Sequence, residues 1–284
     1  MMFTSLAVAA PLATLLGYIP SPSSGSVHVG PVQLRAYGLM IGLGVLAAVW
    51  VGQRRWVARG GDPDDISSIA MWAVPAGLIG SRVYHVATDW KRFTGRWGDV
   101  FAIWQGGLGI PGGLAAGVLV GVLVARRRDM SVPAMLDSLV PTLPIAQAIG
   151  RWGNWFNQEV FGGPTDLPWG LRIDEANRPT EYLTSTAFHP TFLYEGIWNL
   201  ALAWFLIRVD RRGVLRPGYL IGLWVFGYGV GRLWMETIRV DAAFLVWGLR
   251  VNIWMSLVAI AVGGAVAVSG RVAAVAADPT SDLH

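Results

Sequence analysis

The sequence contains no cysteine and few histidines. Among its 284 residues there are no cysteines and only four histidines. The lack of cysteine excludes disulfides, a thiolate zinc site, an iron–sulfur cluster and a thiol nucleophile of the protein's own. The small number of histidines argues against a His-rich metal site. We therefore expect no metal and no cofactor.

Charged residues are also scarce. They make up 14% of the chain and hydrophobic residues 54%, whereas a soluble domain carries about 25% charged residues. This argues against a water-soluble enzyme, and the high hydrophobicity excludes a disordered chain. The net charge of +4 is better explained by a basic cytoplasmic face against anionic lipid than by nucleic-acid binding.

The sequence contains several long apolar stretches. A membrane helix needs roughly 20 mostly apolar residues to cross the hydrocarbon layer. The sequence predicts an all-α fold, a polytopic membrane bundle of about seven transmembrane helices with a small outer cap. The predicted spans are about 36–53, 66–87, 106–125, 132–150, 190–207, 217–236 and 252–269.

Arginine clusters predict the orientation of these spans. They follow spans one, three and five, in alternate connections. The positive-inside rule makes that side cytoplasmic, with the N-terminus outside and the C-terminus inside. We expect residues 1–35 to form an outer-face segment, with a cleaved signal or an extra span at 5–19 as alternatives. Residues 36–270 form the membrane domain, with an outer cap at 153–188, and 271–284 a cytoplasmic tail.

The densest polar cluster is GRWGNWFNQEVFGGP at residues 150–164, where span four meets the outer side. Arg151 and Asn154 share one helix face. A guanidinium binds phosphate through paired hydrogen bonds, and amides bind ester and hydroxyl oxygens. The pattern indicates a site for an anionic head group. The alternative to a binding site is that Arg151 lies at the membrane interface between Trp152 and Trp155 and has no ligand.

A second cluster, YGVGRLWMETIR at residues 228–239, ends span six. Arg232, Glu236 and Arg239 are spaced as one stripe of a helix. Two arginines around one glutamate indicate a positively charged site, in which Glu236 orients an arginine. The alternative is an internal salt-bridge ladder that allows the charges to be buried.

Four further motifs contain polar residues in the outer half of the bundle. HPTFLYEG opens span five and offers His189 as a candidate base, although a lone histidine at a helix start is more often a cap. The others are GSRVYH with Arg82, RAYGLM with Arg35 and Tyr37, and the Gly-rich loop WQGGLGIPGG. Ionisable residues at membrane depth are functional candidates, and one-sided clustering favours a site where a lipid head group meets a partner from outside.

Together these motifs resemble prolipoprotein diacylglyceryl transferases. GRWGNWFNQEVFGGP is similar to the signature of that family, and HPTFLYEG, YGVGRLWMETIR, RAYGLM and GSRVYH occur in the family's order. The resemblance covers about residues 30–270. It implies transfer of diacylglyceryl from phosphatidylglycerol to the lipobox cysteine of a prolipoprotein signal peptide, with glycerol phosphate released. It also implies the outer face of the bacterial inner membrane and no cofactor.

The resemblance also assigns residues. It implies that Arg151 and Asn154 contact the head group and that Arg232 holds the departing phosphate. It places these residues around the site: Tyr37, Glu159, Gly162, Glu236 and Arg239. One position departs from the family, because Pro111 stands where many members carry a histidine proposed as the base. Either another residue, such as His189, activates the thiol, or positioning beside arginine suffices.

A competing interpretation is a lipid- or anion-binding transporter that uses the same arginines without turnover. It predicts polar groups in the inner half of the bundle as well. Asp137, early in span four, is the residue that meets this expectation.

Overall fold

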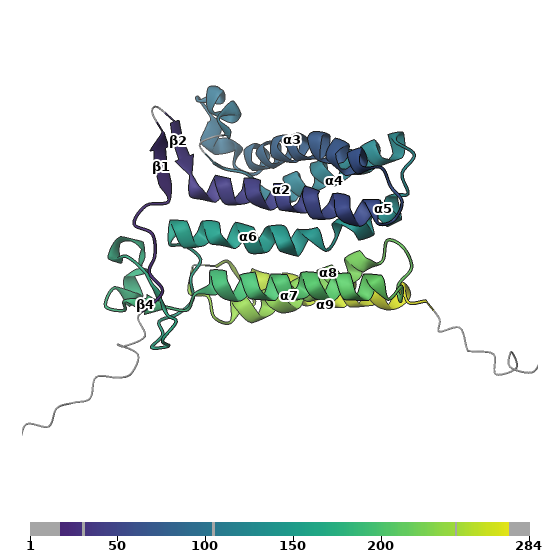
Figure 1. Cartoon of the computed structure of the whole chain (residues 1–284). Coiled ribbons are helices and arrows are strands. Elements are labelled where there is room, and N and C mark those ends of the chain that lie inside the picture. The colour runs from purple at the N-terminus through teal and green to yellow at the C-terminus, as the bar shows by residue number, and fades with distance from the viewer. Residues whose placement is uncertain (1–17, 30–31, 104–105, 242, 273–284) are drawn as a thin grey trace, which may run out of the picture.

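The computed structural model describes residues 18–29, 32–103, 106–241 and 243–272, and its helices run side by side as one bundle (Figure 1). Residues 1–17 of the predicted outer-face segment and residues 273–284 of the predicted tail lie outside the described residues. The α-helices are α2 (Ala36–Val57), α3 (Pro63–Thr88), α4 (Ile110–Arg127), α5 (Val132–Leu139), α6 (Thr142–Asn157), α7 (Thr191–Arg211), α8 (Leu220–Glu236) and α9 (Val251–Ser269).

The helical membrane fold predicted from composition is confirmed. Among the described residues, six helical segments are long and apolar enough to cross a membrane, with Val132–Asn157 taken as one of them. Helix α8, which corresponds to the sixth predicted span, has 17 residues and is not among the six. The total of seven spans therefore stays a prediction.

The fourth predicted span differs from the structure in two ways. It is divided into α5 and α6, because Pro141 follows the end of α5 at Leu139 and a proline removes a backbone donor and clashes with the preceding turn. Helix α6 also runs to Asn157, well beyond the expected end at 150. Arg151 and Asn154 consequently lie on a helix, and the cap begins after it.

Glycines bring pairs of helices into close contact. A Cβ on Gly80 of α3 would lie 2.5 Å from the carbonyl oxygen of Gly112 on α4, and one on Gly229 of α8 would lie 2.9 Å from the carbonyl oxygen of Ser256 on α9. Small residues allow this approach between membrane helices. The glycines at 112 and 113 in the Gly-rich motif therefore pack α4 against α3.

Short strands and turns surround one end of the bundle, here called the cap end (Figure 1). Three antiparallel ribbons join β1 (Ser26–Val29) to β2 (Val32–Arg35), β3 (Leu171–Arg172) to β4 (Ala187–Phe188), and β5 (Leu245–Val246) to β6 (Leu249–Arg250). Single-turn 3-10 helices are η1 (Trp90–Phe93), η2 (Trp97–Phe101), η4 (Glu175–Asn177) and η5 (Thr180–Tyr182).

The cap, residues 158–188, has a small core of its own. Ile173 and Phe188 are fully buried in it beside Phe192 of α7. The N-terminal segment is attached to it, because the backbone N–H of Ile19 donates to Gly170 and that of Arg172 donates to Ile19. These contacts attach the cap to the N-terminal segment and to the start of α7.

Polar groups at the far end of the bundle are paired with one another. Asp210 binds Arg55 at 2.8 Å and Arg59 at 2.6 Å. Asp137 accepts the backbone N–H of Gly218 at 2.8 Å and so caps the segment that enters α8. This bond gives Asp137 a structural role, which removes the support that it offered to the transporter interpretation.

Candidate active site

Three helices meet at the cap end and enclose a small polar cavity. Each contributes residues four positions apart, which lie on one helix face. The lining consists of Gln147 and Arg151 of α6, Glu195, Trp198 and Asn199 of α7, and Tyr228, Gly231, Arg232 and Met235 of α8. The cavity therefore joins the first two polar clusters of the sequence to the motif that opens α7.

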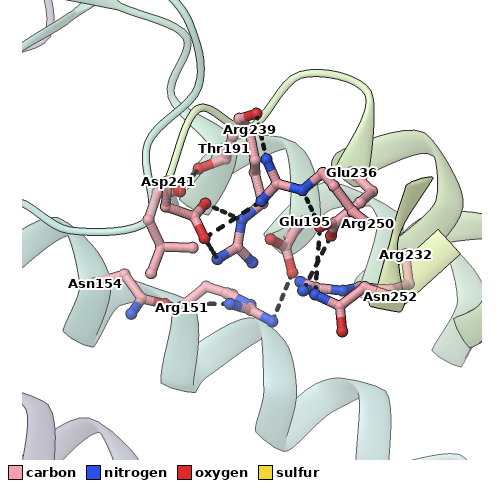
Figure 2. A network of polar contacts seen from close by, with 11 residues as sticks. Arg151, Asn154, Thr191, Glu195, Arg232, Glu236, Arg239, Asp241, Arg250 and Asn252 are labelled. Carbon is pink, nitrogen blue, oxygen red and sulfur yellow. Dashed lines mark hydrogen bonds and ion pairs between the residues drawn. The ribbon is translucent and has the colours of Figure 1, made fainter. Parts of the chain in front are cut away.

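Arg151 is held by partners on two sides. Its Nη2 lies 2.6 Å from Glu195 Oε2, and its Nη1 donates to Asn154 Oδ1 at 3.3 Å. The amide of Asn154 donates in turn to Glu159 Oε1 at 2.9 Å. The predicted shared face of Arg151 and Asn154 is confirmed, and Glu195 is the counter-ion that the prediction did not assign (Figure 2).

Glu236 is the most deeply buried carboxylate of the cluster, with no exposed side-chain surface. It pairs with Arg232 at 3.1 Å, as predicted from the spacing of four. The second cation is Arg250, whose Nε lies 2.5 Å from Glu236 Oε1, and the amide of Asn252 donates to the same oxygen at 3.3 Å. Arg239 does not take this place, so the predicted pair of arginines around Glu236 is corrected to Arg232 and Arg250.

Arg239 pairs with Asp241 instead, because α8 ends at Glu236 and Arg239 leaves the helical stripe. Two guanidinium nitrogens bind the two carboxylate oxygens at 2.6 and 2.9 Å. Burial by itself raises the pKa of Asp241, but hydrogen bonds and charge from Arg239 outweigh it and lower that pKa. Arg250 lies 3.4 Å from the same carboxylate, so Asp241 links the two arginines.

The cluster drawn in Figure 2 has an excess of positive charge. It contains four arginines, at 151, 232, 239 and 250, and three paired carboxylates, Glu195, Glu236 and Asp241. The difference is one positive charge, counted without Glu159, whose exposed carboxylate accepts from Asn154. Such a site favours a ligand with one negative charge, such as a phosphodiester. Among the described residues no group of three His, Asp or Glu side chains is placed to hold a metal ion.

A strained turn follows Arg151 and Asn154 in the sequence. Val160 has a φ of 61°, a left-handed conformation that is rare for a β-branched residue. Its carbonyl accepts a hydrogen bond from the Thr191 hydroxyl. The backbone N–H of Gly162 then donates to the His189 carbonyl at 3.0 Å, and Gly162 forms an antiparallel bridge with Arg239. The turn thus connects Glu159 to the arginine cluster through backbone contacts.

The predicted base lies beside this cluster and not in the cavity lining. His189 Nδ1 is 3.2 Å from the Tyr194 hydroxyl, which also accepts from the indole of Trp169 at 3.0 Å. Tyr37 lies on α2 with its ring against Gly153, where a Cβ would approach that ring to 2.6 Å. The structure therefore brings Arg151, Asn154, Arg232, Glu236 and Arg239 together, with His189, Tyr37, Glu159 and Gly162 at the margins.

Arg82 has a structural role in the Gly-rich loop. Its guanidinium donates to the carbonyl oxygens of Val100 at 2.8 Å, Gly106 at 2.6 Å and Gly107 at 3.1 Å. Pro111 follows this loop in the first turn of α4, a position that suits a proline because no backbone donor is needed there.

Comparison with known proteins identifies the family of this chain. Residues 25–269 match the profile of the family described as prolipoprotein diacylglyceryl transferase. The chain belongs to this family. It is 49% identical over 247 residues to a phosphatidylglycerol–prolipoprotein diacylglyceryl transferase of Streptomyces griseus, covering 86% of this chain and 74% of the relative. A second relative of that name, from Rhodococcus jostii, is 47% identical over 257 residues, with 85% and 72% covered.

Five residues of the candidate site were not identified from the sequence: Gln147, Tyr228, Asp241, Arg250 and Asn252. Arg250 and Asn252 stand at the entrance of α9, the most apolar span, with a mean hydropathy of 2.0. Polar residues at such a position are themselves a signal. Gln147 was detectable because it precedes Arg151 by four residues, and Tyr228 because it precedes Arg232 by four.

Proposed function

We propose that this chain transfers the diacylglyceryl group of phosphatidylglycerol to the cysteine thiol of a prolipoprotein lipobox. The observation that carries the proposal is the cavity in which Arg151 and Arg232 meet between three helices. Membership of the transferase family and the names of its relatives support the same substrates. The reactive thiol belongs to the substrate, so the absence of cysteine in this chain is no obstacle.

The proposed reaction is a displacement at a glyceryl carbon. The substrate sulfur forms a bond to that carbon while the carbon–oxygen bond to the phosphate breaks. The electron pair of the broken bond stays with the oxygen of the departing glycerol phosphate, and the thiol proton is released. Negative charge grows on the leaving oxygen, and fixed cations aimed at it are most effective in a site that excludes water.

Arg151 and Arg232 have the properties that this step requires. Both lie at the cavity, and a guanidinium stays protonated, so their role is electrostatic and not acid–base. In the structure each is paired with a carboxylate, Glu195 or Glu236. A bound phosphate would share these cations with the carboxylates, and Glu236, held by Arg250 and Asn252, would orient Arg232 without reacting.

Thiol activation is assigned to the positive field of the cluster. A cysteine near guanidinium groups has a lowered pKa and is more reactive as the thiolate. Pro111 can neither accept nor donate a side-chain proton. His189 is the alternative base, and its contact with Tyr194 places it at the margin of the site.

We further propose that the cap end faces outward from the bacterial inner membrane, with the N-terminus outside and the C-terminus in the cytoplasm. The arginines after α2, α4 and α7 support this orientation, because they all lie at the far end of the bundle and basic residues favour the cytoplasmic side. Outer-leaflet lipid and secreted prolipoproteins would then reach the cavity from the same side.

The decisive experiment is incubation of the purified full chain with phosphatidylglycerol and a lipobox peptide, followed by mass measurement of the peptide. We expect the peptide to gain the mass of one diacylglyceryl group. A peptide with serine in place of the cysteine is the control. Binding of lipid with no change in peptide mass would instead support a lipid-binding protein.

A further inference from the structure

Two oxygen atoms in the cavity lack hydrogen-bond partners. Gln147 Oε1 and Glu195 Oε1 are both buried, and neither has a donor among the described residues. The Glu195 side chain is 9% exposed and uses its other oxygen, Oε2, to bind Arg151 at 2.6 Å. Buried acceptors without donors are costly, and a native site that keeps them requires an explanation.

Both atoms belong to residues that line the cavity with Arg151 and Arg232. Gln147 is one helical turn from Arg151 on α6, so the two side chains share a face. Glu195 reaches the same space from α7. The cavity therefore combines cations suited to a phosphate with acceptors suited to a neighbouring donor group.

We propose that Gln147 and Glu195 form a subsite for the hydroxyl groups of the glycerol head group of the donor lipid. This inference rests on the proposed function, because it assigns the part of the donor that leaves with the phosphate. The phosphate binds the arginines, and the two head-group hydroxyls, whose oxygens lie three and four bonds from the phosphate ester oxygen, donate to the two free oxygens.

The chemistry of the two residues favours hydroxyl groups. A hydroxyl both donates and accepts, so it matches the Gln147 amide in either orientation of that amide. A lipid whose head group carries an ammonium would also supply donors, but it has no net charge, whereas the cluster has one positive charge in excess and favours an anionic lipid. Sites built around polar groups discriminate strongly against ligands that leave them unpaired.

A bound water is the alternative partner of these oxygens. The empty volume of the cavity is about 310 Å³ with the part that opens to solvent, and about 20 Å³ of it can hold the centre of a water molecule, which is enough for one water. A water would satisfy both acceptors with any lipid in the site, whereas the proposed subsite gives a preference for a hydroxylated head group. The two explanations therefore differ in lipid selectivity.

The test compares phosphatidylglycerol with phosphatidylpropanol, which has the same three head-group carbons and no hydroxyls. Lipid retention by the purified full chain is measured by native mass spectrometry, and transfer to a lipobox peptide by kcat/KM. Gln147→Leu removes the amide at similar size. Gln53→Leu is the matched control, because Gln53 bonds Pro63 and Ser67 at the far end of the bundle.

We expect the wild-type chain and Gln53→Leu to favour phosphatidylglycerol over phosphatidylpropanol by about ten- to a hundredfold. Phosphatidylpropanol cannot make the two hydrogen bonds of the subsite, of which one is to a charged group. In Gln147→Leu the preference should fall several-fold, because retention and kcat/KM should decrease for phosphatidylglycerol and stay the same for phosphatidylpropanol. Equal use of both lipids by the wild type, or an unchanged preference in Gln147→Leu, would overturn the subsite. A wild-type chain that retains phosphatidylglycerol selectively but transfers nothing would refute the proposed function and leave the subsite standing.

Discussion

Arg250, which stands directly before the last helix, holds Glu236 of α8 through a 2.5 Å contact between Nε and Oε1. The carboxylate that faces Arg232 is thus fixed from a second element of the chain. The Glu236 side chain is fully buried, and these two cations compensate its carboxylate. The geometry makes Arg250 a positioning residue for the candidate site.

Replacing Arg250 with methionine should destabilise the protein and lower activity. The substitution leaves Glu236 with Arg232 and Asn252, and the loss of a hydrogen bond to a charged group costs about 1.5–3 kcal/mol. Thermal unfolding in detergent and the transfer rate measure the two effects. Arg250→Lys, which keeps the charge, should recover part of each, whereas Arg126→Met at the exposed end of α4 should change neither. An unfolding temperature like that of the wild type in Arg250→Met would show that Glu236 does not need this partner.

Arg151 and Arg232 should not tolerate lysine. Each binds a carboxylate in the structure and is proposed to bind phosphate oxygens, a planar contact that an ammonium cannot reproduce. We expect Arg151→Lys and Arg232→Lys to lose roughly ten- to a hundredfold in transfer rate. Lysine at positions 126 and 127 should be tolerated, because only the sign of charge matters there, whereas Arg128 binds Asp65 through Nε at 2.8 Å and is not part of this control. Wild-type turnover by both site variants would contradict the phosphate contact.

The ion pair between Arg239 and Asp241 should make stability depend on pH on the acid side. The pKa of Asp241 is lower in the folded state, where burial raises it but Arg239 lowers it more. Its contribution is therefore present above the ordinary aspartate pKa of about 4 and is lost as pH falls through the lowered value. The stability difference between wild type and Asp241→Asn should be largest above about pH 5 and shrink below pH 4. A difference that is constant from pH 7 to pH 3 would exclude this linkage.

Pro111 should be dispensable for chemistry. It occupies the first turn of α4, and alanine suits that position, so Pro111→Ala should keep most of the activity.

Of the histidines near the cap end, His189 is the alternative base and His85 packs edge-on against Phe93. The transfer rates of His189→Gln and His85→Gln test whether either histidine activates the substrate thiol. Near-normal turnover in both excludes activation of the thiol by either residue.

The orientation of the bundle can be tested with single cysteines, since the chain has none. Glu181→Cys in the cap should react with an impermeant thiol reagent on intact cells, and Arg127→Cys at the end of α4 should react only after the membrane is opened. Both positions are exposed in the structure. Labelling of the second position but not the first on intact cells would reverse the topology.

The helices could be predicted from the sequence because their apolar length is a local property. Contacts four residues apart, such as Arg232 with Glu236, were predictable for the same reason. The partners of Arg151 and Glu236 across helices were not, because Glu195 and Arg250 approach them only through packing. The chain breaks before α6 at Pro141, whereas apolar length alone predicts one continuous span through this proline. The ribbon strands at the cap end are too short to produce a periodic pattern.

The position of Arg250 in the chain also bears on biosynthesis. The arginines of α6 and α8 are made first, together with the carboxylates of α7 and α8 that they contact. The cation that completes the pairing of Glu236 is made only when the chain reaches its last helix. A nascent chain that ends before residue 250 therefore carries a carboxylate with one cation at membrane depth. Assembly of the last helix against α8 is thus the step that completes the pairing of Glu236.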